Sequence, residues 1–300
     1  MRWFTEYKQS LKMAEVEEVL DLFLYRPIAF LLVKSIYRTK ITPDHLTLGA
    51  MVVGLTGGFL YAFGLPQTSI VGAIFYILFI ILDCSDGQLA RLKKNGTKIG
   101  RLLDGIADYI VVTAIYIGLA IGYSQKGDQP VKVLIILALS GISVTIQSLL
   151  VDYYRTRFLD IVLNRTNTFK DGINEYRDEY IKIKDQKGKW LEKNIIFIYL
   201  IYSKIQKRII GRKKRESSVT ASPQDYYDKN RIMMRFWLIM GPSAIRTWLI
   251  ICSFIGRFDI YFWVTIAGFN ILSIILALIQ HRIDKSYLAF PDKLLSNIPK

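Results

Sequence analysis

The stretch ILDCSDGQLARLKKNGTKIGRLLDGIADYI, residues 81–110, joins the end of one apolar segment to the start of the next. Within it, Asp83 and Asp86 stand three residues apart, and Asp104 and Asp108 stand four apart. Residues at these spacings fall on one face of an α-helix, so each pair shares a face. The residues between the two pairs are enough to turn the chain. The stretch therefore predicts two neighbouring helices whose acidic faces meet.

The segments around this stretch are long and apolar. Of the 300 residues, 52% are hydrophobic and 13% are aromatic, and the apolar residues cluster in runs of about twenty. A helix of about twenty residues crosses a hydrocarbon layer of about 30 Å. The sequence therefore predicts an all-α integral membrane protein, a six-transmembrane-helix bundle built from three hairpins. The six predicted spans are Leu46–Phe63, Ile70–Leu89, Leu102–Tyr123, Val131–Val151, Phe236–Ile255 and Ile260–Ile279.

The basic residues lie on one side of the predicted bundle. The net charge is +15, residues 152–235 hold twenty Lys and Arg against eleven Asp and Glu, and the loop at 91–101 adds five. The opposite side carries Lys126, Lys132 and Arg257. This is the positive-inside pattern, which predicts a multi-pass protein with both termini and the acidic pairs at the cytoplasmic face, in contact with membrane lipids. Because no recognised binding motif accompanies the charge, we expect no nucleic-acid partner.

Two regions outside the spans have their own patterns. Apolar residues recur at helical spacing in the N-terminal segment, at Met13, Val16, Val19, Leu20, Phe23 and Leu24. They predict an N-terminal amphipathic surface helix, or a helix packed against the bundle. The insertion has a helical pattern at 174–187, a short apolar patch at 195–202 and a basic cluster at 212–215, which predict a cytoplasmic helical insertion on anionic lipid. The predicted division is 1–41 (juxtamembrane), 42–151 (spans one to four, with the acidic motif at 83–108), 152–235 (insertion), 236–281 (spans five and six) and 282–300 (cytoplasmic tail).

Four acids near a bilayer need a counter-charge. One charge at the centre of a spanning helix costs about 2.5–3.5 kcal/mol, and like charges repel besides. Hard divalent cations such as Mg²⁺ and Mn²⁺ prefer carboxylate oxygens and commonly bridge them to phosphates. The alternative is that the acids pair with basic neighbours, which does not explain two facing acidic helices; those neighbours are Arg91, Lys93, Lys94 and Arg101. The predicted metal ligands are Asp83, Asp86, Asp104 and Asp108.

Small residues stand beside the acids. Gly87 and Ala90 leave a bare helix face next to the carboxylates, and Gly100 permits close approach to the next helix. Arg91, one turn after Gly87, has a forked donor that suits a diphosphate. The glycines alone are equally compatible with close helix packing.

The pattern Asp83-xx-Asp86-Gly87-xx-Ala90-Arg91-x8-Gly100-xxx-Asp104-xxx-Asp108 resembles the complete signature of the CDP-alcohol phosphotransferase family. The resemblance includes a surface helix, six spans and the motif across spans two and three. It also includes the entry to span one, residues 42–47, where Asp44 stands in place of the family's usual Asn. The insertion at 152–235 has no counterpart in the compact members.

The resemblance implies a phosphotransferase of phospholipid biosynthesis with two Mg²⁺ or Mn²⁺ ions. Asp83, Asp86 and Asp104 would be metal ligands, and Asp108 a ligand or the general base, which is our expectation. The CDP-binding residues would be Asp86, Gly87, Ala90, Arg91 and Gly100. The resemblance also implies a homodimer.

The substrates are less constrained by the sequence. One version uses CDP-diacylglycerol or a related CDP-lipid as donor and a polar alcohol as acceptor. The other uses CDP-choline, CDP-ethanolamine or CDP-inositol as donor and a lipid or polar hydroxyl as acceptor. We favour the first, because residues 17–47 are faintly similar to the inositol-handling members. A non-enzymatic alternative is a cation transporter whose ion site is the four aspartates.

A phosphate-bearing acceptor would be collected by arginines. The candidates are Arg155, Arg157, Arg231, Arg235 and Arg246, of which the last lies within span five. An ionisable residue in a span is a functional candidate. The alternative for the first four is charge that sets topology, and for Arg246 it is snorkelling or pairing with Asp152.

Overall fold

The computed structural model describes residues 2–11, 16–125, 129–164, 168–184, 186, 189–190, 193–197, 199–201 and 222–285, and these are organised around helices. The predicted basic cluster at 212–215 lies outside the described residues. The chain divides into two compact units, Met1–Val151 with Trp237–Leu272 and Asp152–Phe236 with Ser273–Lys300.

Five helical segments are long and apolar enough to cross a membrane, which is consistent with an integral membrane protein. They are Pro66–Lys93, Ile99–Ser124, Pro130–Val162, Pro223–Ile255 and Phe258–Lys285. They coincide with predicted spans two to six. The first predicted span forms helix α3 (Pro43–Tyr61) but is not among the five. Its 19 residues include His45, Asp44 and four glycines, which lower its mean hydropathy.

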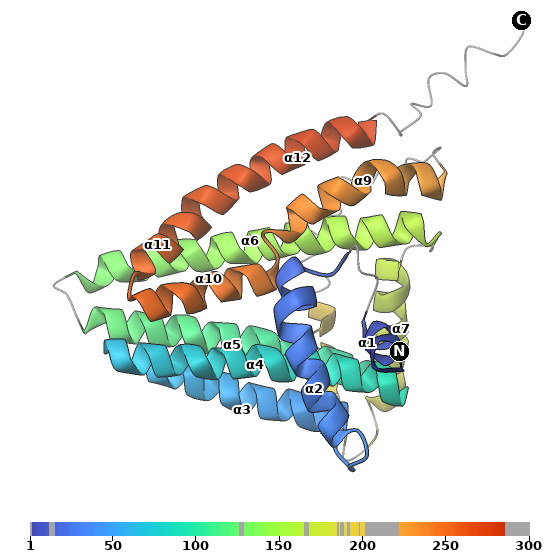
Figure 1. The fold of residues 1–300 in the computed structure, drawn as a ribbon, viewed down its shortest axis with the longest axis horizontal. Coiled ribbons are helices and arrows are strands. Elements are labelled where there is room, and N and C mark those ends of the chain that lie inside the picture. The colour runs from blue at the N-terminus through green and yellow to red at the C-terminus, as the bar shows by residue number, and fades with distance from the viewer. Residues whose placement is uncertain are drawn as a thin grey trace, which may run out of the picture. The chain divides into compact units, whose positions relative to one another are not determined.

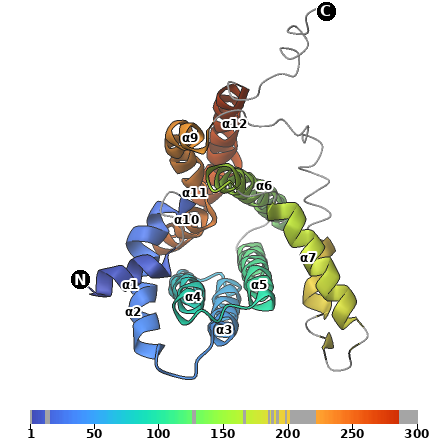
Figure 2. The same cartoon turned by 90° about the vertical axis from the view of Figure 1, so that its right-hand side faces the viewer.

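The first unit is organised around α3. This helix packs against both α4 (Pro66–Lys93) and α5 (Lys98–Ser124), as Figure 1 shows, and the view along the helices in Figure 2 shows the three as one group. This unit also holds α1 (Arg2–Ser10), π-helix η2 (Asp21–Tyr25), α2 (Arg26–Ile36), most of α6 (Pro130–Val162), α10 (Pro242–Ile255), α11 (Phe258–Trp263), π-helix η4 (Val264–Gly268) and the start of α12 (Phe269–Lys285). Of these, α1, α2 and α10 pack against α4, the helix that carries the first acidic pair.

Two glycines allow α3 and α5 to touch. A Cβ added to Gly118 of α5 would overlap the carbonyl oxygen of Gly58 on α3, and a Cβ on Gly58 would meet the backbone of Ala114. Close approach of this kind, through small residues, is common between helices in membranes. It fixes α5 along α3, and with it the positions of the acids on α5.

The N-terminal segment differs from the predicted single helix. The chain is not helical at Glu17 and Glu18, and the next helical stretch begins at Val19. Phe23 is 80% exposed, whereas Glu17, Glu18 and Asp21 are buried. The three acids are buried because each has partners within the first unit.

The second unit holds the end of α6 (Pro130–Val162), α7 (Thr168–Ile183), most of α9 (Pro223–Leu238) and the end of α12 (Phe269–Lys285). The helix predicted at 174–187 corresponds to α7. Polar side chains join this unit: Arg157 pairs with Asp284 at 2.6 Å, and Gln280 donates to both Asn230 and Asp284. The unit therefore has its own buried polar contacts.

Candidate active site

The first acidic pair lies near the end of α4. The helix starts with Pro66 at its first turn and ends where Lys94 adopts a left-handed conformation, φ 53°. A left-handed residue commonly closes a helix, and here it turns the chain toward α5. Asp83 and Asp86 therefore lie within the last three turns of α4, next to the connection.

The second pair lies near the start of α5. Thr97 caps this helix, because its side-chain oxygen accepts a hydrogen bond from the Gly100 amide at 2.8 Å. The cap fixes where α5 begins, and Asp104 follows one turn after Gly100. A short connection therefore joins the two acidic helices, as the sequence predicts: α4 ends at Lys93 and α5 begins at Lys98.

Three carboxylates converge here. One oxygen each from Asp83, Asp86 and Asp104 lie within 4.8 Å of one another, and we call this group the aspartate triad. Two like charges at this separation repel by about 3 kcal/mol at an effective dielectric constant of about 20. Three carboxylate oxygens are also the donor set that Mg²⁺ and Mn²⁺ prefer. The triad therefore fits a hard divalent cation.

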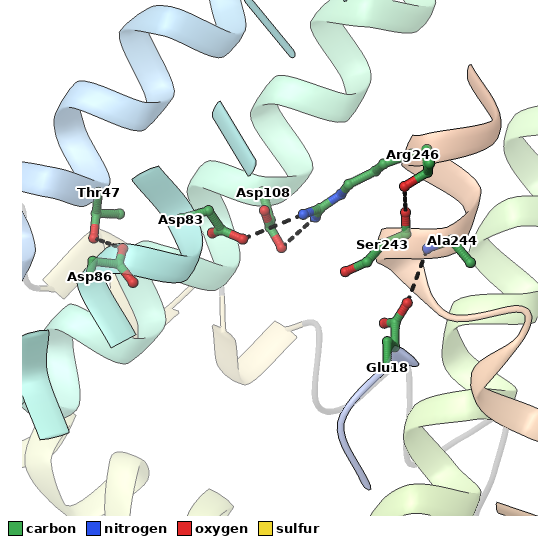
Figure 3. A network of polar contacts seen from close by, with 9 residues as sticks. Glu18, Thr47, Asp83, Asp86, Asp108, Ser243, Ala244 and Arg246 are labelled. Carbon is green, nitrogen blue, oxygen red and sulfur yellow. Dashed lines mark hydrogen bonds and ion pairs between the residues drawn. The ribbon is translucent and has the colours of Figure 1, made fainter. Parts of the chain in front are cut away.

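Asp108 is held differently. Its Oδ2 accepts from Nη2 of Arg246 at 2.7 Å, while Nη1 of Arg246 lies 3.4 Å from Oδ2 of Asp83 (Figure 3). The guanidinium also lies 5.4 Å from the ring centroid of Phe79. The second oxygen of Asp108, Oδ1, is buried and has no hydrogen-bond partner among the residues that the structure describes. One side of this carboxylate is thus fixed by a cation and the other is left to accept a proton or a ligand.

Arg246 was expected to bind the acceptor, to snorkel or to pair with Asp152. The pairing with Asp152 is wrong: Asp152 pairs with Arg155 at 2.9 Å, and Arg246 lies at the aspartates. The alternative that nearby basic residues neutralise the acids does not describe Arg91 and Lys93, which donate to backbone carbonyls. The guanidinium that pairs with the aspartates belongs to Arg246 of α10, far along the chain.

Thr47 is a site residue that the sequence analysis missed. Its hydroxyl donates to Oδ2 of Asp86 at 2.5 Å, and Figure 3 shows the two side chains facing each other. Asp86 and Thr47 are each 4% exposed. A buried partner of this kind orients a metal ligand. The position of Thr47 one turn after the start of α3 was the available signal.

The predicted CDP-binding residues line the same end of α4 and α5. A Cβ on Gly87 would stand 3.4 Å from the guanidinium of Arg91, whose Nε donates to the Ser10 carbonyl at the end of α1. A Cβ on Gly100 would overlap the carboxylate of Asp44. Both glycines therefore leave room for a charged side chain at the motif.

The predicted acceptor arginines fall in two groups. Arg155 and Arg157 belong to the second unit and pair with Asp152 and Asp284. Arg231 in the same unit is exposed, and Arg235 is partly buried. Only Arg246 lies in the unit that holds the aspartates.

Residues 40–170 match the family described as CDP-alcohol phosphatidyltransferase. These residues make up less than half of the chain. The match confirms the resemblance carried by the aspartate motif, because all four aspartates lie within it. The CDP-alcohol phosphatidyltransferase domain also contains Thr47, whereas Arg246 of α10 lies beyond its end.

Known relatives have the same kind of domain. The chain is 33% identical over 96 residues to a phosphatidylinositol phosphate synthase of Mycolicibacterium smegmatis, over 32% of this chain and 40% of the relative. It is 34% identical over 93 residues to a protein of the same name from Corynebacterium glutamicum, over 31% and 40%. For the Mycobacterium tuberculosis protein the identity is 28% over 108 residues, 35% of this chain and 48% of the relative. The chain spans less than half the length of these relatives.

Proposed function

We propose that this protein transfers a substituted phosphate group from a CDP-linked donor to the hydroxyl of a polar alcohol, with release of CMP. The observation that carries the proposal is the aspartate triad, whose three carboxylate oxygens lie within 4.8 Å, with Asp108 held beside it by Arg246. The family domain over residues 40–170 supports the same reaction class.

The aspartate triad would hold one or two Mg²⁺ or Mn²⁺ ions, which neutralise the diphosphate and stabilise the departing CMP. Thr47 fixes the orientation of Asp86 through the 2.5 Å hydrogen bond. Arg91, beside Gly87, would bind a phosphate oxygen of the donor with its forked guanidinium.

Asp108 is the general base in this proposal. Its Oδ1 accepts the proton of the acceptor hydroxyl while Oδ2 stays with Arg246. The acceptor oxygen forms a bond to the phosphorus that carries the donor's alcohol group, and the bond from this phosphorus to the CMP oxygen breaks. The proton thus passes to Asp108 and the electron pair leaves with CMP.

The donor we favour is CDP-diacylglycerol or a related CDP-lipid, and the acceptor a phosphorylated polar alcohol such as inositol phosphate. The names of the three relatives support this pairing. Arg155, Arg157, Arg231, Arg235 and Arg246 remain the candidates for the acceptor's phosphate. CDP-choline, CDP-ethanolamine or CDP-inositol as donor, and a cation transporter, are the competing functions.

The membrane topology belongs to the proposal as well. Helix α3 is a span as well, the first in the chain, and it brings the number of spans to six. Its 19 residues extend about 28 Å at 1.5 Å per residue, and Val52 and Phe59 expose 61% and 65% of their surface. Both termini and the aspartates face the cytoplasm, with the juxtamembrane segment on the membrane surface, as the distribution of basic residues favours. The resemblance to the family implies that two copies form a homodimer.

The test uses the purified full chain in lipid nanodiscs. We expect metal-dependent CMP release from radiolabelled CDP-diacylglycerol with inositol phosphate, glycerol phosphate or serine as acceptor, abolished by EDTA and restored by Mg²⁺ or Mn²⁺. CMP release only from CDP-choline or its analogues would move the assignment to the second donor class. Absence of CMP release with every donor, together with cation flux in liposomes, would establish a transporter instead.

A further inference from the structure

A second group of acids lies buried outside the family domain. Glu17, Glu18 and Asp21 stand between α1 and α2 and are 4%, 4% and 7% exposed; we call them the acidic turn. Each has partners in the first unit. Glu17 pairs with Arg26 at 2.7 Å, and Asp21 lies beside Ser243 and Arg26. The mechanism proposed above uses none of these acids.

Glu18 caps a helix that follows 226 residues later in the chain. Its Oε2 accepts a hydrogen bond from the backbone amide of Ala244 at 3.0 Å, in the first turn of α10. The residue at the capping position of α10 is Gly241, which has no side chain to satisfy these amides. A carboxylate at the positive end of a helix is favourable, and it fills the place of the missing cap.

The shape of the contact is as specific as its charge. A Cβ added to Gly241 would overlap the carboxyl group of Glu18. The glycine therefore admits the carboxylate directly against the end of α10. Any other residue at 241 would push Glu18 away from the Ala244 amide.

The capped turn continues directly into Arg246. This residue lies two positions after Ala244 on α10, and its guanidinium holds Asp108 at 2.7 Å and approaches Asp83 at 3.4 Å. Figure 3 shows the series from Glu18 through Ala244 and Arg246 to the two aspartates. A shift of the first turn of α10 would move the guanidinium off Asp108.

We infer that Glu18 is a positioning residue for catalysis, which sets the first turn of α10 so that Arg246 holds Asp108 in place to accept the acceptor's proton. The inference rests on the proposed function. A displacement of about 1 Å at a reacting group can cost about a hundredfold in rate. Loss of the cap can therefore lower the rate by more than the loss of one hydrogen bond alone would.

The test is a double-mutant cycle between Glu18→Ala and Arg246→Lys, with kcat and KM for CDP-diacylglycerol and inositol phosphate measured in nanodiscs. We expect each single variant to lower kcat by about tenfold to a hundredfold with little change in the donor KM. If Glu18 acts through Arg246, the double variant should match Arg246→Lys within about threefold. Effects that multiply would overturn the inference.

The chain offers a matched control in Glu17. It lies in the same turn and is equally buried, and it pairs with Arg26 of α2 at 2.7 Å. Glu17→Ala should lower the unfolding temperature, and its effect on kcat should multiply with that of Arg246→Lys. Glu18→Gln keeps an acceptor for the Ala244 amide and should recover most of the kcat lost in Glu18→Ala. Failure of glutamine to recover any activity would contradict a cap.

A readout without activity separates this inference from the proposed function. In hydrogen exchange, Glu18→Ala should speed exchange of the peptide covering residues 241–250, whereas Glu17→Ala should leave its rate unchanged. If Glu18→Ala does not fold, Gly241→Ala displaces the same carboxyl from the other side and should give the same non-additive kinetics with Arg246→Lys. No CMP release from the unmodified chain would remove the proposed function; CMP release with an unchanged exchange rate would remove the inference alone.

Discussion

The aspartate triad and the acidic turn are both clusters of three acids in the first unit, and they are built in opposite ways. In the triad, carboxylate oxygens of Asp83, Asp86 and Asp104 face one another within 4.8 Å. In the acidic turn, Glu17 faces a guanidinium and Glu18 a helix amide. The first arrangement concentrates negative charge and the second disperses it. Concentrated charge is what a divalent cation binds, whereas paired charge holds helices in register.

Removal of a triad ligand should have the largest effect. Asp83→Asn, Asp86→Asn and Asp104→Asn should each lower CMP release by about a thousandfold, since metal stabilisation of the reaction is worth several kcal/mol and 1.4 kcal/mol is tenfold in rate. Mn²⁺ should also no longer raise the unfolding temperature of these variants, which thermal unfolding would measure. A Glu17→Gln variant is the control and should keep its Mn²⁺ response. Equal loss of the Mn²⁺ response in the control would erase the contrast between the two clusters.

Asp108 should show the next largest effect. Asp108→Asn keeps the size of the side chain but cannot take up a proton, so kcat should fall by about 10²–10⁴-fold. Binding of the CDP-linked donor should stay within about threefold of the unmodified chain. Isothermal titration with the donor in the presence of Ca²⁺, alongside single-turnover CMP release, measures both. Loss of donor binding with intact chemistry would make Asp108 a ligand-binding residue and not the base.

The sequence predicted what is local in this site and missed what is distant. Asp83 and Asp86 share a face because of helical spacing alone, and a short connection brings α5 back to them. The partner of Arg246 could not be predicted in this way, since Asp83 lies 163 residues away and helical spacing gives a face but no neighbour. For the same reason, the sequence analysis could not predict that Glu18 contacts the first turn of α10, 226 residues later in the chain. The first span was predicted from an apolar run of about twenty residues, and the glycines and Asp44 of α3 lower the mean hydropathy of the helix that forms there.

Thr47 tests whether the triad depends on its supporting contacts. Thr47→Val keeps the shape of the side chain and removes the hydroxyl that donates to Asp86. Loss of a hydrogen bond to a metal ligand typically costs about 10–100-fold in metal affinity. The concentration of Mn²⁺ that gives half-maximal CMP release should rise by this factor, with a smaller change in kcat at saturating metal. Thr47→Ser should behave like the unmodified chain. An unchanged Mn²⁺ requirement in Thr47→Val would mean that Asp86 is oriented without its partner.

Asp21 should give the smallest effect, and its sign distinguishes the acidic turn from the triad. Burial raises the pKa of Asp21 above its ordinary value of 3.8, against the opposing influence of Ser243, Arg26 and Arg246 and with that of Glu17. A carboxyl whose pKa is raised by folding favours the folded state at pH below its ordinary pKa, and this contribution is lost as the pH rises through the raised value. At neutral pH, Asp21→Asn should therefore keep the unfolding temperature or raise it by a few degrees. The advantage of the variant should shrink as the pH is lowered toward 4, as thermal unfolding in nanodiscs across this pH range would measure. A large loss of stability in Asp21→Asn at neutral pH would show that its charge is needed where it lies, as the charges of the triad are.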